Sequence, residues 1–154
     1  MALAKAIKTN MSYIKIWIHA VWGTKNRQPL LKLPILKKVC EHIKNNSVEK
    51  GFFIDTINGF DDHIHCLMLL QYDNSISKQM QLIKGKSAFW FNKNKIINSV
   101  FEWADKYFAT SVSDSKIDPV RTYINNQQEH HRKITFAEEY KTFLKKFGYK
   151  EDFG

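Results

Sequence analysis

The sequence has few of the residues that cross-link or interrupt a chain. Its 154 residues include two cysteines, three prolines and six glycines. Two cysteines are too few for a disulfide scaffold at this length, and Cys40 and Cys66 both lie among apolar residues, where cysteine usually packs as a small core side chain. Because proline and glycine are scarce, no stretch is typical of a flexible linker. The sequence therefore predicts one domain over residues 1–154.

A long hydrophobic run is also lacking. No apolar stretch approaches the roughly 18–20 residues that a membrane-spanning helix needs. The N-terminal segment MALAKAIKTN is interrupted by lysines and lacks the apolar centre of a secretion signal. We therefore expect a cytoplasmic protein without a membrane partner.

Acidic residues are the third deficit. Asp and Glu number 15 against 24 Lys and Arg, which gives a formal net charge of +9. A surplus of this size predicts an anionic partner, either nucleic acid or a membrane surface. The hydrophobic content of 44% is sufficient for a packed core, so the positive charge belongs to a folded domain.

The periodic segments predict an α+β fold. Alternation over 12–24 predicts a strand, and helical periodicity predicts a helix over about 34–50 that ends at Gly51. The order of elements favours an antiparallel sheet close to the split βαβ arrangement. Strands are further predicted over 52–59, 62–71 and 106–113, and Asn58-Gly59 predicts a hairpin between the first two. Helices are predicted over 75–94, 114–131 and 135–148. Their N-caps are, in order, Ser75 or Ser77, Asp118 before Pro119, and Thr135, and the last helix stops at Gly148.

Two histidines begin the apolar strand DDHIHCLMLL, residues 61–70. Residues i and i+2 of a strand point to one face, so His63 and His65 project side by side, as two ligands of one metal ion would. Taken alone, the pattern favours two packed histidines that bind backbone carbonyls. Asp61-Asp62 before the pair is either a turn or a source of a carboxylate that orients a histidine.

The predicted helix PVRTYINNQ adds a second group of candidate residues. Tyr123 and Gln127 are one turn apart and share a helical face. A tyrosine hydroxyl has a pKa near 10 and is a poor nucleophile at neutral pH, but a metal ion that binds the target phosphate compensates for this. The glutamine oxygen could complete the metal's ligand set. A packed tyrosine beside a solvated glutamine is the alternative that helical spacing alone favours.

The segment EHHRK follows the tyrosine. His130 lies two turns after Tyr123 on roughly the same helical face, which makes it a rival third metal ligand. With His131 and Arg132, however, it forms a cluster that we interpret as a basic helix end facing DNA or solvent.

Basic residues are interleaved with aromatic residues in two other stretches, WGTKNRQPLL and LIKGKSAFWF. This combination suits single-stranded nucleic acid, because phosphates bind cations and bases stack on rings. A solvated helical face is the alternative interpretation. The candidate DNA-binding residues are Lys25, Arg27, Lys84, Lys86 and, beside the tyrosine, Arg121.

Five of these segments occur in an order that resembles a known family. They are VWGTKNRQPLL, DDHIHCLMLL, LIKGKSAFWF, YFATSVS and VRTYINNQ. Over about residues 13–127 the chain resembles the single-tyrosine HUH transposases of the insertion sequence 200/605 family, named for a His, bulky apolar residue, His motif. The resemblance implies a ferredoxin-like, RRM-like HUH fold, with an antiparallel sheet, helices on one face and a C-terminal catalytic tyrosine helix.

The resemblance also implies roles for individual residues. His63 and His65 correspond to the metal-binding histidines, Tyr123 to the nucleophile and Gln127 to the third metal ligand. The implied reaction cleaves and rejoins single-stranded DNA through a 5′-phosphotyrosine intermediate, without ATP. The family implies Mg²⁺ or Mn²⁺, whereas two imidazoles and an amide would suit Mn²⁺, Zn²⁺ or Ni²⁺ better than Mg²⁺.

The expected partner is single-stranded DNA with hairpin ends, bound by a homodimer in which a tyrosine can act in trans. The tail 128–154 resembles that of a chromosomal subset associated with repeated extragenic palindromes. A domesticated protein that processes palindromic repeats is therefore one alternative. A non-catalytic single-stranded nucleic-acid binder and a metal-dependent phosphodiesterase that uses water are two others.

Overall fold

The computed structural model describes residues 13–149. Helices and strands alternate in the order that the sequence predicts, with short 3₁₀ turns η1 and η2 after β1 and β4. Within residues 13–149 no helix combines the length and the apolar character needed to cross a bilayer. The elements are β1 (Trp17–Thr24), η1 (Lys25–Arg27), α2 (Leu33–Lys50), β2 (Ile54–Phe60), β3 (His63–Leu69), α3 (Ile76–Lys93), β4 (Trp103–Val112), η2 (Asp114–Lys116), α4 (Ile117–Asn125), α5 (Gln127–His130) and α6 (Phe136–Lys146).

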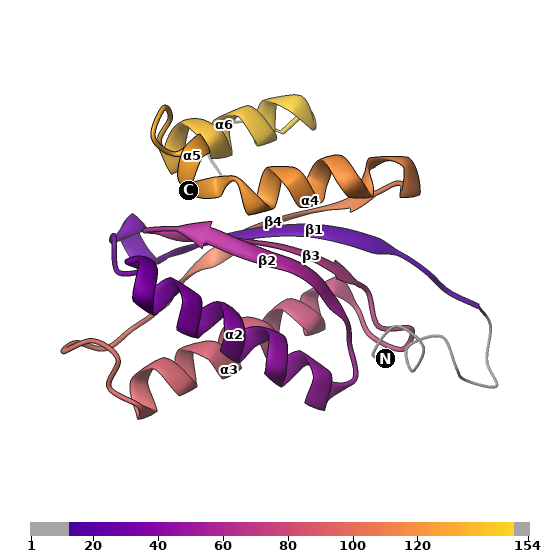
Figure 1. Cartoon of the computed structure of the whole chain (residues 1–154). Coiled ribbons are helices and arrows are strands. Elements are labelled where there is room, and N and C mark those ends of the chain that lie inside the picture. Colours follow the sequence, from indigo (N-terminus) through magenta and orange to yellow (C-terminus); the bar gives the residue numbers. More distant parts are fainter. Residues whose placement is uncertain (1–12, 150–154) are drawn as a thin grey trace.

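The four strands form one sheet with the order β2-β3-β1-β4. Every neighbouring pair is antiparallel, and β3 and β1 occupy the centre. Helices α2 and α3 lie on one face, and α4, α5 and α6 lie on the other (Figure 1). The predicted α+β class with an antiparallel sheet is confirmed.

The face under α2 and α3 carries the main apolar core. Alternate residues of the central strands point into it, as the period of two requires. Phe91 of α3 stacks on Phe101 with ring centroids 3.9 Å apart, and both rings are almost fully buried. The strand residues of this core are Ile18, Ala20 and Trp22 from β1, Ile64, Cys66 and Met68 from β3, Ile54 from β2 and Trp103 from β4.

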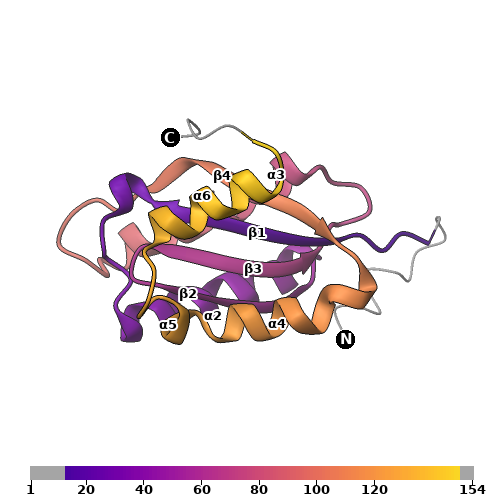
Figure 2. The ribbon, with the colours of Figure 1, turned by 90° about the horizontal axis from the view of Figure 1, so that it is seen from above.

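The opposite face lies under the three C-terminal helices. Seen from above, α4 follows the β2 side of the sheet and α6 follows the β4 side, so β3 and β1 lie between them (Figure 2). Ile124 of α4 packs on Leu67 and Leu69 of β3. From α6, Phe136 and Leu144 pack in a second cluster with Val21 and Phe108 of the sheet. The remaining side chains on this face of β3 are His63 and His65.

The β2–β3 hairpin turns at a different place from the prediction. Asn58 and Gly59 lie within β2 and pair with His65 and Ile64, and the turn is formed by Asp61-Asp62. A Cβ at Gly59 would collide with the carbonyl oxygen of His63, which explains the glycine. The Asn-Gly pair therefore permits close strand approach and is not the turn.

The strand ends also differ from the prediction. Residue 12 of the predicted strand lies outside the described residues, and from residue 13 onward β1 starts only at Trp17, with Tyr13, Ile14 and Ile16 exposed. β4 starts at Trp103, earlier than the predicted residue 106. Its first residue pairs with Thr24 across a register shift, and such an irregularity is not visible in the residue pattern.

The predicted helix over 114–131 is divided. A 3₁₀ turn precedes α4, whose N-cap is Lys116, so Asp118 and Pro119 belong to its first turn. α4 ends at Asn125, and α5 starts at Gln127. The predicted caps at Ser75 and Thr135 are confirmed, because each side chain accepts a hydrogen bond from a backbone N–H one turn later.

A candidate metal and tyrosine site

β3 places two histidines on the face covered by α4 and α6. His63 and His65 are fully buried. The Nδ1–H of His63 donates to the Asp62 carboxylate at 2.9 Å, and Nδ1 of His65 lies 2.9 Å from Nε2 of His19 on β1. Asp61-Asp62 therefore forms the hairpin turn, and Asp62 also orients His63, so both sequence-based interpretations apply.

α4 and the start of α5 bring the next two predicted residues to the same place. Gln127 is fully buried, and its Oε1 lies 3.0 Å from Nε2 of His63. The half-buried Tyr123 packs edge-on against His65, with ring centroids 5.5 Å apart. A solvated glutamine is thus the wrong alternative, and the four residues that the sequence singled out meet in one cluster.

Glu139 on α6 lies at the centre of this cluster. Its side chain is 2% exposed. Oε1 lies 3.3, 3.1 and 3.2 Å from the Nε2 atoms of His63, His65 and His131. Oε2 accepts the hydrogen bond of the Tyr123 hydroxyl. One carboxylate therefore connects three imidazoles with the candidate nucleophile.

The sequence analysis missed Glu139, although a signal was present. Glu139 lies on the apolar face of the predicted helix over 135–148, together with Phe136, Tyr140 and Leu144. A carboxylate in such a stripe must find buried partners, because an unpaired buried charge costs several kcal/mol. Its partners lie on β3 and α5, which a local pattern does not identify.

The segment EHHRK is partly misinterpreted from sequence. The side chain of His131 is 1% exposed, and its Nδ1–H donates to the carbonyl oxygen of Ile134 at 2.9 Å. His130 is 29% exposed, and its Nε2 lies 3.1 Å from Oε2 of Glu139. Arg132 and Lys133 are exposed, as expected of a basic helix end. The prediction is wrong for His131, which belongs to the buried cluster.

α6 is held over the site by ring contacts and by its cap. Phe136 stacks on His63 with ring centroids 4.0 Å apart and an interplanar angle of 1°. Gly23 of β1 makes room for this ring, because a Cβ there would lie 2.8 Å from Cε2 of Phe136. Thr135 and Glu138 form a reciprocal capping box at the start of α6.

Burial and the shared carboxylate set the charge states of the histidines on the strands. Burial lowers the pKa of His65 to about 4 and that of His19 to about 3, so both rings are neutral at pH 7. For His63 the effect of burial is outweighed by hydrogen bonds to Asp62 and Glu139, which raise its pKa. The cluster therefore combines neutral imidazoles with one ring that attracts a proton or another cation.

Glu139 and Tyr123 are affected in opposite directions. Burial alone would raise the pKa of Glu139, but hydrogen bonds from His131, His63 and His65 lower it well below its usual range. Burial, together with the hydrogen bond to Glu139, raises the pKa of Tyr123. In this arrangement the tyrosine is therefore a phenol and the glutamate is a carboxylate.

The cluster has the chemistry of a metal site. One ligand atom each from His63, His65, His131 and Glu139 lies within 4.8 Å of the others. Imidazole nitrogens with a carboxylate oxygen suit ions such as Mn²⁺ and Zn²⁺. The residues present therefore fit the ion that the resemblance implies.

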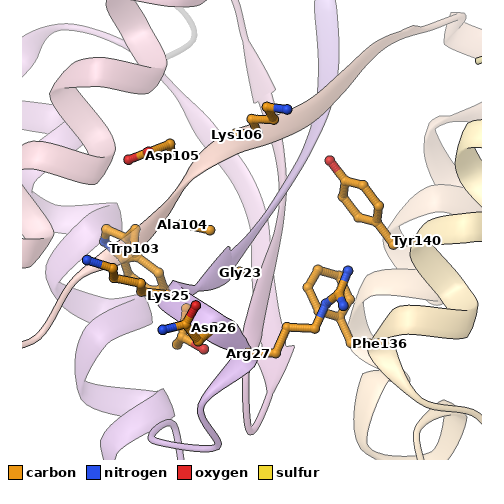
Figure 3. Close-up of a pocket in the computed structure, with 11 residues that line it drawn as sticks. Gly23, Lys25, Asn26, Arg27, Trp103, Ala104, Asp105, Lys106, Phe136 and Tyr140 are labelled. Atoms are coloured by element: carbon orange, nitrogen blue, oxygen red, sulfur yellow. The ribbon is translucent and has the colours of Figure 1, made fainter. Parts of the chain in front are cut away.

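A pocket of about 510 Å³ opens beside the cluster. Lys25 and Arg27 of η1 line it, together with Phe136 and Tyr140 of α6, and Figure 3 shows the Arg27 side chain extending across the Phe136 ring. Lys25 is paired with Glu102 at 2.8 Å, whereas Arg27 is exposed. Phe136 thus has one ring face on His63 and also contributes to the pocket.

The other three candidate DNA-binding residues lie elsewhere. Nζ of Lys84 donates to the carbonyl oxygens of residues 104 and 105, and Lys86 is exposed on α3, across the sheet from the cluster. Arg121 binds the Asp55 carboxylate through Nε and Nη2, both at 2.8 Å. This pair attaches α4 to β2, so the guanidinium group of Arg121 has carboxylate partners within the protein.

The fold and the cluster together define the HUH class, in which a His-x-His pair on a central strand faces a tyrosine helix. The sequence matches the family described as transposase IS200-like over residues 12–127, and the chain belongs to this family. No curated protein matches the chain. The family match ends at residue 127, so α6 and its Glu139 lie outside it.

Two solved structures share the fold. One is a candidate transposase from Deinococcus radiodurans R1, with 21% identity, a TM-score of 0.62, and coverage of 78% of this chain and 97% of that one. The other is a REP-associated tyrosine transposase bound to a REP hairpin, with 18% identity, a TM-score of 0.57, and coverage of 80% and 73%.

Proposed function

We propose that this transposase-family protein cleaves and rejoins single-stranded DNA with Tyr123 as the nucleophile. The observation that carries the proposal is the position of Tyr123: its ring packs on the buried His65, and its hydroxyl binds Glu139, whose other oxygen faces His63 and His65. Gln127 lies one turn away. Family membership supplies the class of reaction. The side-chain arrangement supplies the candidate residues for each role.

The proposed reaction is a transesterification. The Tyr123 oxygen attacks the phosphorus of a phosphodiester, the bond from phosphorus to the 3′ oxygen breaks, and the leaving oxygen takes a proton to become a 3′ hydroxyl. The 5′ phosphate stays attached to Tyr123. Attack by a 3′ hydroxyl on this phosphotyrosine reverses the step and rejoins a strand, so no ATP is consumed.

The side chains around the tyrosine have distinct tasks. His63, His65 and Gln127 would hold the metal ion. When bound, an ion supplies charge neutralisation and orientation of the phosphate. Oε2 of Glu139 accepts the hydrogen bond of the hydroxyl and is the candidate acceptor for its proton, and Nε2 of His130 lies 3.3 Å from the tyrosine oxygen.

The DNA strand would approach through the pocket that Arg27 and Phe136 line. A guanidinium group beside aromatic rings suits a phosphate followed by a base. The similar fold of a transposase bound to a REP hairpin supports a hairpin-bearing substrate, from either a mobile element or palindromic repeats. One chain contributes both the tyrosine and the histidines, which supports cleavage in cis. A homodimer with exchanged tyrosines stays a prediction.

The test is a covalent adduct assay. The protein is incubated with 5′-overhang and 3′-overhang hairpin oligonucleotides and with Mg²⁺ or Mn²⁺, and the products are separated on a denaturing gel. We expect a slowly migrating protein–DNA species that Tyr123→Phe abolishes. Tyr72→Phe is the matched control, because Tyr72 lies in the turn after β3, outside the cluster. An adduct that persists in Tyr123→Phe would sink the proposal.

The same gel separates the alternatives. A non-catalytic binder forms no adduct, and its salt-sensitive DNA binding is unchanged by Tyr123→Phe and by chelators. A metal-dependent phosphodiesterase that uses water releases cut DNA without any protein–DNA link.

A further inference from the structure

The side chains of His131 and Glu139 are buried at the cluster although neither residue lies within residues 12–127, the segment that matches the family. Both side chains are nearly inaccessible to solvent. They contact the histidines of β3 through atoms that can bind a cation. Their place in the site therefore needs its own explanation.

The hydrogen bonds of the histidines indicate which nitrogen is free. The Ile134 carbonyl and the Asp62 carboxylate can only accept, so the Nδ1 atoms of His131 and His63 carry the hydrogens. In a neutral ring the Nε2 atom then presents a lone pair. Both Nε2 atoms nevertheless face two acceptor oxygens, Oε1 of Glu139 at 3.2 and 3.3 Å and Oε1 of Gln127 at 3.0 Å. Two acceptors at this distance require a positive species between them, either a proton or a metal ion.

The third histidine has the same orientation. Nε2 of His65 faces Oε1 of Glu139 at 3.1 Å, and its Nδ1 is occupied by His19. Metal-bound histidines in proteins typically use one ring nitrogen for the ion and the other for a carboxylate, a carbonyl or a similar partner. All three rings meet this description, with Asp62, His19 and Ile134 as the partners.

The spacing of the donor atoms also fits one ion. Ligands bound at about 2.0–2.1 Å in a tetrahedron lie roughly 3.3–3.4 Å apart. The observed distances from Oε1 of Glu139 to the three Nε2 atoms are 3.1–3.3 Å. The three distances to the carboxylate are therefore close to those of a tetrahedral site, and the distances among the three imidazoles, at most 4.8 Å, would have to shorten on binding.

We propose that His131 and Glu139 join His63, His65 and Gln127 in the metal-binding set, so that the ion's ligands include three imidazoles and one carboxylate. The inference rests on the metal-binding part of the proposed function. It assigns two ligands to the C-terminal segment beyond Gln127. Because three of the five donors are nitrogen, the set selects Mn²⁺ or Zn²⁺ over Mg²⁺, which prefers oxygen.

Calorimetric titration of the metal-stripped full chain tests this assignment. Zn²⁺, Mn²⁺ and Mg²⁺ are titrated separately into the wild type, Glu139→Gln and His131→Asn. Asparagine keeps a donor near the position of Nδ1 and removes Nε2. Glu138→Gln is the matched control, since this neighbour on the same helix is exposed and glutamine still completes a capping box.

We expect Zn²⁺ and Mn²⁺ to bind the wild type more tightly than Mg²⁺. Both ligand variants should weaken Zn²⁺ binding at least tenfold, and Glu138→Gln should not. Unchanged Zn²⁺ affinity in both ligand variants would overturn the inference and leave an ion held by His63, His65 and Gln127. No binding by the wild type would overturn the inference together with the metal-binding part of the proposed function. Neither result depends on formation of the tyrosine–DNA adduct.

The wild type alone provides a second measurement, in case a variant does not fold. Histidine ring ¹⁵N spectra are recorded before and after addition of Zn²⁺. Three rings should become fixed with the hydrogen on Nδ1, and His42, which stacks on Trp90 of α3, should not change. A change confined to two rings would contradict the assignment of His131.

Discussion

The two faces of the sheet use the same strands for different purposes. Under α2 and α3, the residues of β3 are Ile64, Cys66 and Met68, and the face is a continuous apolar core. Under α4 and α6, the residues that alternate with them begin with His63 and His65, and a carboxylate is buried among imidazoles. The apolar face stabilises the fold through area removed from water, at about 25 cal/mol per Å².

The comparison explains how a small domain tolerates a costly site. Buried polar clusters contribute little net stability, because desolvation offsets much of their attraction. Here the desolvation cost falls on the histidine face under α4 and α6, and the apolar face under α2 and α3 contains few polar groups. Truncations on the apolar face should therefore alter stability most, and changes to the residues of the histidine face should alter metal binding and chemistry most.

The largest expected effect is on the apolar face. Phe91→Ala removes a fully buried ring from α3, and such truncations cost about 3–5 kcal/mol. Phe89→Ala on the same helix is the control, because Phe89 is 64% exposed. The free energy of unfolding from urea titration measures both. Similar losses in the two variants would contradict the assignment of the core to this face.

Between pH 7 and pH 5, acid should destabilise the protein through its histidine face, with about 2 kcal/mol from each of His65 and His19, because burial lowers the pKa of both rings, that of His19 to about 3. The pKa of His65 is about 4 in the folded protein and about 6.5 in the unfolded chain. In this window the unfolded state binds the proton that the folded state excludes, so stability falls as pH falls. His63, whose pKa is raised, acts with the opposite sign and offsets part of the loss. The lowered pKa of Glu139 contributes only below about pH 4.5.

Urea unfolding at pH 7 and pH 5 with a chelator present measures this acid sensitivity. Equal stability at the two values would show that the buried histidines do not titrate as proposed.

Thr135→Ala tests how firmly α6 is held over the site. Loss of the N-cap hydrogen bond to Glu138 should cost about 1 kcal/mol. Amide hydrogen exchange should become faster in α6, and exchange in α2 and α3 should not change. Faster exchange throughout the sheet would mean that α6 does not open independently.

The smallest expected effect is on DNA binding. Arg27→Ala should weaken binding of a single-stranded hairpin up to roughly fivefold, as for an exposed charge pair. It should also reduce the slope of log affinity against log salt by about 0.7. Fluorescence anisotropy over a salt series measures both quantities. Lys86→Ala, on the apolar side of the molecule, is the control, and an equal effect there would contradict the position of the DNA beside α6.

Local patterns predict the parts of this molecule that depend on neighbours in sequence. The alternation of residues in β3 correctly places His63 and His65 on one face, and the cap at Thr135 correctly starts α6. The same patterns fail where distant contacts decide. The break after Asn125, the burial of His131 and the docking of Glu139 all depend on packing against β3.

The carboxylate of Glu139 has one oxygen near the three imidazoles and the other on the Tyr123 hydroxyl. An ion bound to the first oxygen and a proton bound near the second are therefore coupled ligands of one group, and coupling free energies are reciprocal. If ion binding changes the pKa of Tyr123, then ionisation of Tyr123 must change the binding free energy of the ion by the same amount. If the proposed ion binds, it would therefore be thermodynamically linked to the Tyr123 hydroxyl even though the two need not touch.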